Sequence, residues 1–598
     1  MNADKLERLR SFPYVEAAIA LVVVVVLGAM FIDTRHMAPQ SAPRLAQTSG
    51  SNAIEFDVIT VNPIIAKDFN LPYAAGVLIN SEPKGAARRL FDLTRGDVIL
   101  KYNNVDVQSA HHLAFLMSSS KPGDTVQFVV SRNGKMLTIN NKIPAATGLD
   151  IFAPEGRNIA IALVIILVTF AMISLNLFDR TVCAILGAVV MLVAGSLFGF
   201  YKQSEAFDAI KMSPIFIFLG MGVFAVFLED LRFFQYATKR MIVFFKADKV
   251  RILMGLCVMT FLFSMFAGSL RVMILLLVMI PITIYAARTL MFDPVPVVIF
   301  EIIAANIGST ATAIGGFANM QVASVTGITF LDFLIYLLPI TIVCFLASLA
   351  YMWFTEFRQH KILRSVKQEK VLLLGVEHEL EGMHMDWPAV KMVLYVLGAV
   401  IAAFFVLPVF RIQLAPIALG GAFLLLAIEH HKARHVIRKV RLIDAIYYIA
   451  IFIIVGGAVY SGLLNNISDI LMSISAGNKV LYPIFLLWFV AAFTILLNPG
   501  AAAAFFIPVV MHSGFADFTD VVWWALSLGV MVGSCTCLTP ASGGVITHQL
   551  TEELHVAKLD GRSKEGLTFA SYNRRGLPIS LILLVISTAY IFIICNSQ

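Results

Sequence analysis

Two short stretches rich in small polar residues decide the fold: Asn306-Ile307-Gly308-Ser309-Thr310-Ala311-Thr312 and Gly533-Ser534-Cys535-Thr536-Cys537. Each lies inside a longer apolar region, 295–325 or 521–550, that is rich in Gly, Ser and Thr. Irregular backbone at membrane depth is tolerated only where protein or a water-filled cavity surrounds it. Paired, glycine-interrupted segments of this kind are typical of a midplane binding site in a membrane carrier.

The sequence around these stretches has the composition of a membrane protein. Of its 598 residues, 59% are hydrophobic and 14% are charged, whereas a soluble protein carries about 25% charged residues. Apolar runs of about 20 residues can cross a bilayer. The sequence predicts about a dozen such spans, at 15–33, 158–176, 182–200, 213–229, 252–268, 271–288, 331–353, 389–407, 413–429, 443–463, 481–497 and 577–595. No A-x-A site follows the first, which we expect to be an uncleaved anchor.

The net charge of +7 is placed as membrane topology requires. Basic residues cluster in short segments beside the spans, at 5–10, 232–251, 358–370, 432–441 and 558–575. The positive-inside rule puts these segments in the cytoplasm, so the charge predicts no nucleic-acid partner. The six cysteines fall almost entirely in apolar segments, which argues against a disulfide framework.

The membrane part contains two related halves. Arg271 and Asn498 each stand ten residues before a proline, Pro281 or Pro508, and a Gly-Ser pair follows each proline after 27 or 25 residues. The segment 230–251 is basic, while its counterpart 464–479 is nearly neutral. This difference places the two segments on opposite sides of the membrane and predicts inverted repeats.

Residues 54–145 form a different kind of module. Short β-like runs at Gly76–Ile79, Asp97–Tyr102, Thr125–Ser131 and Met136–Asn140 alternate with turn signals, and one helix is expected at Ala110–Ser119. The order of landmarks resembles a PDZ domain of the bacterial HtrA-protease type: Ala75-Gly76-Val77-Leu78, Gly85-Ala86-Ala87, Arg95-Gly96-Asp97-Val98-Ile99-Leu100, Asn103-Asn104, Pro122-Gly123-Asp124-Thr125-Val126 and Arg132-Asn133-Gly134.

A PDZ domain binds a peptide by strand addition. The resemblance implies a carboxylate-binding loop at Ala75, Gly76, Val77 and Leu78, with the predicted helix as the opposite wall of the groove. A PDZ fold that only packs on its own membrane domain is the alternative. One span after a cytoplasmic N-terminus puts the module outside the cytoplasm.

Asn306–Asn319 resembles the "NIGGTATLIGDPPN" hairpin of the ion transporter superfamily, in the branch of arsenite pumps, sodium/proton antiporters and citrate transporters. Gly533–Leu538 and Ala541-Ser542 resemble its second hairpin, and the similarity runs from about 177 to 595. It implies an all-α membrane domain of two inverted repeats with re-entrant hairpins, moving as an elevator within a homodimer. The expected ion- or substrate-binding residues are Arg271, Glu301, Asn306, Gly308, Ser309, Thr310, Thr312, Asn319, Asn498, Ser534, Thr536 and Ser542.

This sequence departs from the family where protons or sodium would bind. Arg271, Gly316 and Asn498 stand where relatives carry aspartates. An intramembrane charge is costly and usually marks function, so Arg271 is a candidate anion ligand. Pairing with Glu301 and snorkelling to a helix end are the alternatives. Glu301 is itself a candidate proton carrier.

Other sites are weaker. His378-Glu379-Leu380-Glu381-Gly382 lacks the second histidine of a zinc protease, so we expect no catalytic group, metal or cofactor. Cys535 and Cys537 are a candidate pair for a soft ion, and Glu429–Arg441 for anionic lipid, but small-residue packing and a cytoplasmic connector explain them equally.

The predicted domains are a cytoplasmic N-terminus (1–14), an anchor (15–33), the PDZ-like module (54–145), a first membrane part (158–353), a cytoplasmic loop (354–388) and a second membrane part (389–596). The sequence predicts a secondary transporter of an inorganic ion or small organic anion in a bacterial inner membrane or a membrane derived from it. Its partners are membrane lipid, the substrate and a peptide at the PDZ domain. A transport-inactive scaffold is the rival. The run from Asp293 to Asn306 is similar to arsenite-pump-like proteins of magnetosome membranes.

Overall fold

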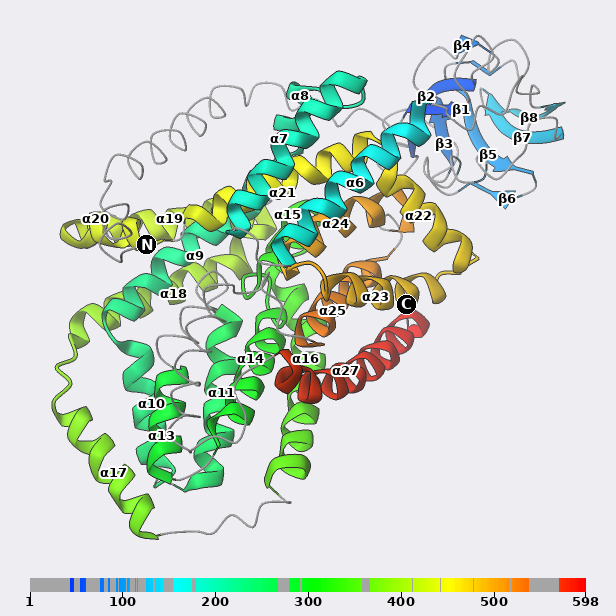
Figure 1. Ribbon diagram of the computed structural model, residues 1–598. Helices are drawn as coiled ribbons and strands as arrows, with labels where there is room; N and C mark the ends of the chain where they lie inside the picture. The colour runs from blue at the N-terminus through cyan, green and yellow to red at the C-terminus, as the bar shows by residue number, and fades with distance from the viewer. Residues whose placement is uncertain are drawn as a thin grey trace, which may run out of the picture. The chain divides into compact units, whose positions relative to one another are not determined.

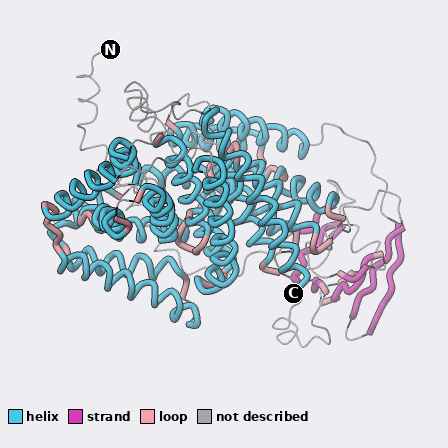
Figure 2. The backbone as a smooth tube through the Cα atoms, turned by 90° about the horizontal axis from the view of Figure 1, so that it is seen from below, coloured by secondary structure: helices cyan, strands magenta, loops and turns pink. Residues whose placement is uncertain are grey.

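The structure is a computed structural model in two compact units, Met1–Gly148 and Leu149–Gln598. It describes residues 44–47, 54–60, 76–79, 84–85, 93–94, 96–103, 105–107, 113, 116, 125–132, 135–142, 154–174, 179–246, 248–266, 279–290, 293–357, 366–410, 412–440, 442–476, 478–515, 519–536 and 569–597. Strands gather in the first unit and helices in the second (Figure 2). The predicted anchor at 15–33 lies outside the described residues.

The first unit is an antiparallel sheet with the strand order β1-β2-β3-β5-β7-β8. Its strands are β1 (Arg44–Gln47), β2 (Ile54–Thr60), β3 (Val77–Ile79), β4 (Lys84–Gly85), β5 (Val98–Tyr102), β6 (Val105–Asp106), β7 (Thr125–Arg132) and β8 (Lys135–Lys142). The four strands expected from sequence are confirmed within a residue or two at each end. β7 and β8 form a hairpin in which Arg132 pairs with Lys135.

Alternating apolar residues of these strands build one core. Val77 and Ile79 of β3, Ile99 of β5, and Val126, Phe128 and Val130 of β7 are at most 1% exposed, and they form one cluster that includes Leu113. Leu113 and Leu116 are the described residues of the expected helix 110–119, and both are helical. Asp97, 1% exposed, accepts hydrogen bonds from Arg132 at 2.8 Å and from the Thr94 amide at 2.9 Å.

The predicted peptide-binding residues Gly76, Val77 and Leu78 lie at the start of β3, and their role stays a prediction. Val77 and Leu78 pair with β2 on one side of β3 and with β5 on the other. A peptide can add only to a strand with a free edge, so β3 cannot receive it. Sequence could not show this because the strand order depends on pairings between distant segments.

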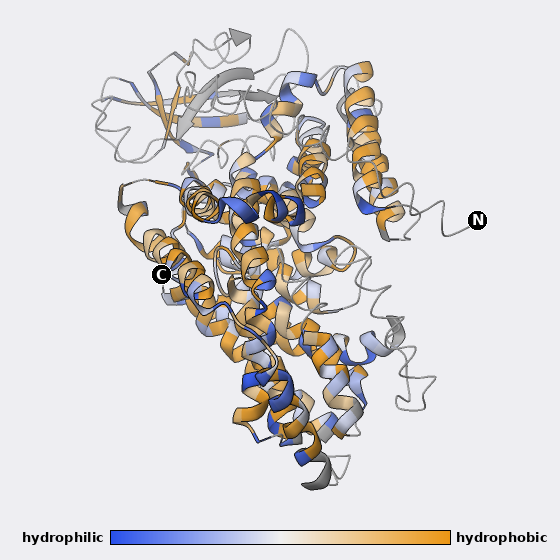
Figure 3. Ribbon diagram, turned by 90° about the vertical axis from the view of Figure 1, so that its left-hand side faces the viewer, coloured by the Kyte–Doolittle hydropathy of each residue, from blue (hydrophilic) through white to orange (hydrophobic). Residues whose placement is uncertain are grey.

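Among the described residues of the second unit, seven helices are long and apolar enough to cross a membrane; Figures 1 and 3 show the arrangement of the helices and the hydropathy of their residues. They are α6 (Pro154–Ser174), α7 (Arg180–Phe198), α9 (Met212–Asp230), α16 (Phe330–Met352, prolonged by a π-helical turn at Trp353–Phe357), α18 (Trp387–Val406), α21 (Leu442–Tyr460) and α27 (Phe569–Ser597). Together they confirm seven of the expected spans.

The other helices are shorter. They are α8 (Gln203–Ala209), α10 (Phe233–Phe244), α11 (Lys249–Phe266), α13 (Ile280–Leu290), α14 (Pro294–Thr310), α15 (Phe317–Thr326), α17 (Val366–Glu381), α19 (Leu414–Ile428), α20 (His430–Lys439), α22 (Leu463–Ile474), α23 (Leu481–Thr494), α24 (Pro499–His512) and α25 (Val521–Thr536), with a 3-10 turn at Leu407–Phe410. The runs at 252–268, 413–429 and 481–497 therefore correspond to shorter apolar helices, whose apolar parts are Val250–Phe266, Leu414–Ile428 and Leu481–Thr494. The expected loop 354–388 contains the helix α17.

Backbone conformation shows the two repeats directly. α10 begins after Arg232 and α22 after Gly462, both left-handed, with φ of 55° and 83°. Each helix is followed by a second left-handed residue, Lys246 or Ala476, at φ of 51° and 49°. Left-handed backbone is costly for residues other than glycine. Its recurrence at the same spacing confirms that these two segments are equivalent.

Packing repeats as well. α14 lies on α11, and α25 lies on α23. A Cβ added to Gly308 of α14 would stand 2.3 Å from the Phe261 carbonyl oxygen, and one added to Gly533 of α25 would stand 2.4 Å from that of Ala491. Both helix pairs therefore approach backbone to backbone, which only glycine allows.

We predict that Gly308→Ala and Gly533→Ala each destabilise the protein by about 1–3 kcal/mol, because the new methyl group overlaps a backbone oxygen. Thermal unfolding of the purified protein in detergent measures the loss. Gly398→Ala is the matched control, since nothing lies within 4 Å of its added Cβ, and its unfolding temperature should not fall. Equal unfolding temperatures for the three variants would contradict the close approach of α14 to α11 and of α25 to α23.

Candidate functional site

The break between α14 and α15 is the centre of the candidate site. Residues Ala311–Gly316 connect the two helices and are buried except for the half-buried Gly316. α14 packs on α11, α16 and α25, whereas α15 packs on α9, α24 and also α25. The predicted hairpin region Asn306–Asn319 therefore consists of the end of α14, a buried connection and the start of α15. The two helices share α25 as a neighbour and otherwise pack on different helices.

Asn319 holds this break together. Its Nδ2 donates to the carbonyl oxygens of Thr310 and Thr312, each at 2.9 Å. The Thr312 hydroxyl donates to the Met265 carbonyl at 2.5 Å, which fixes the break to the end of α11. Asn319 was predicted as a ligand for the substrate or ion. In the structure its side-chain amide binds two backbone carbonyl groups of the break and so stabilises the site.

The other predicted hydroxyl groups also donate to backbone carbonyls. Ser309 and Thr310 both donate to the Asn306 carbonyl, at 2.8 and 3.2 Å. In the second repeat, Ser534 donates to Met531 at 2.8 Å and Thr536 to Val532 at 3.1 Å. The carbonyl groups at the end of α14 are therefore satisfied by the chain itself.

The start of α15 is different. Its N-cap is Gly316, which offers no side-chain acceptor, and Phe317, Ala318 and Asn319 are buried. The first amides of a helix have no intrahelical acceptor, and a helix N-terminus favours a negative charge. The break therefore satisfies its acceptors and leaves donors available, which suits an anionic ligand.

The two repeats meet at this break. Asn306 Nδ2 donates to the Ser534 carbonyl at 2.8 Å, and Gln321 Nε2 donates to the Gly500 carbonyl at 2.7 Å. Phe317, the first residue of α15, lies against Gly500, the second residue of α24. The N-terminal ends of α15 and α24, one from each repeat, are thus neighbours.

The start of α24 is tied to neighbouring helices. Asn498 caps α24 by accepting from the Ala501 amide at 2.8 Å, and its Nδ2 donates to the Tyr447 hydroxyl at 2.6 Å. Arg180 lies 5.3 Å from the Tyr447 ring and forms an ion pair with Asp444 at 2.6 Å. Asn498 thereby lies at the N-terminus of a buried helix.

Glu301 lies on α14, five residues before Asn306, and is 0% exposed. The Thr283 hydroxyl donates to its Oε1 at 2.6 Å, while Oε2 has no hydrogen-bond partner among the described residues. Burying an ionised carboxylate with so little compensation costs several kcal/mol, so this geometry suits a neutral carboxyl. The proposed partner, Arg271, is outside the described residues.

Some predicted residues and some unpredicted ones complete the description. Ala75, Arg271 and Ser542 lie outside the described residues. Sequence analysis missed Gln321 and Tyr447, since one polar residue on an apolar helix is a weak signal. The buried Gln321 Oε1 has no partner among the described residues, a feature that composition cannot show.

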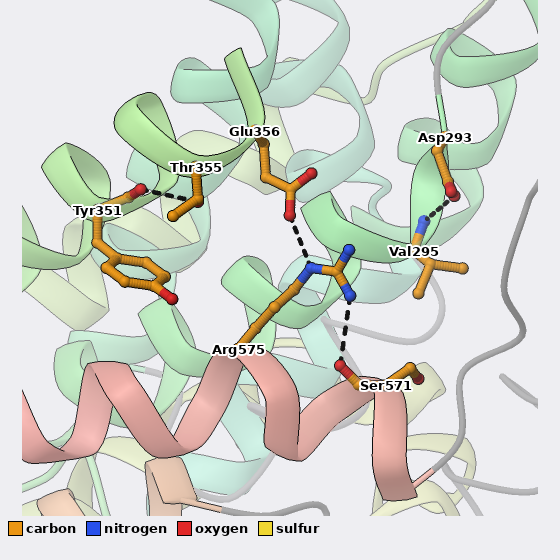
Figure 4. A network of polar contacts seen from close by, with 7 residues as sticks. All are labelled: Asp293, Val295, Tyr351, Thr355, Glu356, Ser571 and Arg575. Atoms are coloured by element: carbon orange, nitrogen blue, oxygen red, sulfur yellow. Dashed lines mark hydrogen bonds and ion pairs between the residues drawn. The ribbon is translucent and has the colours of Figure 1, made fainter. Parts of the chain in front are cut away.

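A separate network joins the last helices of the repeats. Arg575 of α27 donates to Glu356, beyond α16, at 2.8 Å, and to the Ser571 carbonyl at 3.3 Å (Figure 4). The Tyr590 hydroxyl donates to the Tyr336 carbonyl further along the same helix pair. These contacts join α27 to α16 and the turn that follows it at two places along the helix pair.

Comparisons with known proteins match both units. A family profile described as citrate transporter matches residues 161–529, and a PDZ domain profile matches residues 28–143. Magnetosome protein MamN of Magnetospirillum gryphiswaldense is 27% identical over 448 residues, covering 73% of this chain and 99% of that protein. An uncharacterized transporter of Mycobacterium tuberculosis is 26% identical over 443 residues, covering 72% and 98%.

Two further similarities are more distant. The P protein of Mus musculus is 23% identical over 514 residues, covering 73% of this chain and 60% of that protein. The crystal structure of the YdaH transporter of Alcanivorax borkumensis superposes with a TM-score of 0.41 and 11% identity, covering 74% of this chain and 98% of that one.

We predict that Asn319→Asp lowers the free energy of unfolding by about 1–3 kcal/mol, because it leaves two buried carbonyl groups without donors. Thermal unfolding in detergent measures the change. Asn466→Asp, an exposed substitution on α22, is the control and should leave the unfolding temperature nearly unchanged. If the two variants unfold alike, Asn319 does not hold the break.

Proposed function

Because this chain belongs to the citrate transporter family and carries a PDZ domain, we propose that it is a secondary transporter of a small organic anion. The contact of Asn306 with Ser534 supports this proposal most directly, since it joins the two repeats at the helix break. Two repeats that meet at interrupted helices are the usual arrangement of a midplane substrate site. Citrate is the first substrate to test.

The balance of donors and acceptors at the break favours an anion. The carbonyl groups of Asn306, Thr310 and Thr312 already accept hydrogen bonds from the chain. The first turn of α15 has no side-chain cap, so its amides are free to bind carboxylate oxygens. The substrate site proposed here comprises this turn, the start of α24 after Asn498, and the ends of α14 and α25. Gly308, Ser309, Ser534 and Thr536 shape it through the backbone, with Arg271 and Ser542 as additional ligands.

Glu301 is the proposed proton carrier. It is fully buried, with one hydroxyl donor and no cation among the described residues beside it. A carboxyl in such a place exchanges a proton only when movement of α14 brings it to water. Proton release would then accompany the conformational change, which links transport to the pH gradient.

The expected topology completes the proposal. Basic segments beside α10 and α20 mark the cytoplasmic side, and the PDZ domain lies outside the cytoplasm, in the periplasm or in the lumen of a magnetosome. The membrane is a bacterial inner membrane or one derived from it. The transport part moves as an elevator within a homodimer, as proposed for this fold from sequence.

The PDZ domain is proposed to bind a peptide or a protein C-terminus. Since β3 is paired on both sides, the receiving strand must be one at an edge of the sheet. β2 pairs with β3 through Val58–Thr60 and with β1 through Ile54–Asp57. β2 is therefore an interior strand, and the described strands at the two ends of the sheet are β1 and β8, so the receiving strand proposed here is one of these two.

One observation favours the scaffold as a second candidate. Gly316, the N-cap of α15, stands where relatives carry an aspartate, and a relative is named only as a magnetosome protein. In that case the membrane part would anchor the PDZ domain and carry no substrate. A flux measurement separates the two functions.

In proteoliposomes with an imposed pH gradient, we predict citrate accumulation that Glu301→Gln abolishes, while citrate/citrate exchange persists, because the glutamine cannot carry a proton. Asn306→Ala should lower both rates about tenfold, the effect of about 1.4 kcal/mol, because it removes the contact between the repeats. Asn466→Ala is the matched control.

Absence of flux for citrate and other small organic anions, with folded protein in the vesicles, would contradict transport and favour the scaffold. Accumulation by Glu301→Gln equal to that of the natural chain would remove Glu301 from coupling. Arg271→Ala with unchanged flux would likewise remove Arg271 from the site.

We also predict that the full-length protein binds a fluorescent peptide with a free, apolar C-terminus roughly tenfold more tightly than its amidated form, because the carboxylate provides charge-assisted hydrogen bonds. Fluorescence anisotropy in detergent measures both affinities. Equal affinities would argue against recognition of a C-terminus.

A further inference from the structure

The helix α20 (His430–Lys439) divides its basic residues into two groups. One group faces the protein: Lys439 donates to Asp230 at the end of α9, and His435 lies 3.4 Å from the same carboxylate. Lys432 forms an ion pair with Glu429 at 3.2 Å. These contacts fix α20 against the end of a membrane-spanning helix.

Arg434 and Arg438 form the second group. They are one turn apart, on the same face of the helix, and both are exposed. Neither makes an ion pair or a hydrogen bond with the part of the chain that the structure describes. The opposite face contains Val436, which is 0% exposed, so the orientation of the helix is set by packing.

An exposed apolar residue accompanies the two arginines. Ile437 is 49% exposed and, three residues after Arg434, is its neighbour on the helix surface. Apolar side chains flanked by arginines are typical of helices at the membrane surface, where the apolar group enters the lipid and the charge meets the headgroups.

The place of α20 in the chain puts it at this surface. It follows the apolar helix α19 without an intervening loop, since Glu429 both ends α19 and begins α20. The membrane-spanning helix α21 begins at Leu442, two residues after Val440. Figure 1 shows α20 continuing from α19 at one edge of the unit. A helix between two such segments lies at headgroup level.

We propose that Arg434 and Arg438 bind the phosphate of an anionic phospholipid, with Ile437 inserted among the acyl chains. Two guanidinium groups on one face match a phosphodiester, since arginine forms paired hydrogen bonds to phosphate oxygens. The lipid binds on the side of the membrane that the basic segments mark as cytoplasmic, away from the substrate site. This inference is independent of transport.

The test is a titration of full-length protein in detergent with dioctanoyl phosphatidylglycerol, followed by the unfolding temperature. We expect the natural chain to be stabilised, and Arg434→Gln/Arg438→Gln to need about 25-fold more lipid, at about fivefold for each arginine. Arg434→Lys/Arg438→Lys should stay much closer to the natural chain, because it keeps the charges.

Three controls make the outcome decisive. Lys202→Gln/Lys211→Gln removes two exposed charges at the N-caps of α8 and α9 and should leave the midpoint unchanged. Dioctanoyl phosphatidylcholine should not stabilise the protein, and tripolyphosphate tests for a free-phosphate ligand. The proposal is overturned if the glutamine variant keeps the natural midpoint, if the distant variant loses as much, or if tripolyphosphate stabilises as well as the lipid.

Discussion

The hydrogen bonds that Asn319 of α15 donates to Thr310, at the end of α14, and to Thr312, within the helix break, are the interaction on which the membrane unit depends. A helix interrupted within a bilayer leaves amide and carbonyl groups that water cannot reach, and each unsatisfied group costs several kcal/mol. One asparagine satisfies two of the carbonyl groups. Because the carbonyls are satisfied from within, the amides at the start of α15 are left for a ligand.

The two repeats have similar backbone conformations but different side chains at the candidate site. In both repeats a glycine, Gly308 or Gly533, lets one helix pack closely against its neighbour. In both, left-handed residues flank a short helix, which is α10 in the first repeat and α22 in the second. The residues at the site differ, however: Asn306 reaches across to the other repeat, while its counterpart region contributes a backbone carbonyl from Ser534. A substrate bound between unlike halves experiences a directional environment, which suits an asymmetric molecule with a charged end.

Sequence predicted much of this arrangement, for reasons that particular residues make clear. The alternation in Thr125–Ser131 and Met136–Asn140 predicted β7 and β8, and Gly308-Ser309-Thr310 predicted an interruption, because these patterns depend on local chemistry alone. The packing of α15 on α24 and the interior position of β3 depend on which distant segments pack together. Gln321 and Tyr447 were missed because their hydrogen bonds to Gly500 and Asn498 join residues far apart in the chain.

The contacts between the repeats have a consequence for synthesis at the ribosome. Asn306 and its acceptor Ser534 are 228 residues apart, and Gln321 and Gly500 are 179 apart. At about 5–20 residues per second, the first repeat waits on the order of 10–45 s before its partners exist. During that interval the side-chain amides of Asn306 and Gln321 lack the acceptors that they have in the complete protein. The nascent first half must therefore have these groups hydrated or covered by the insertion machinery. Biogenesis, as much as the finished protein, is therefore constrained by where these polar groups stand.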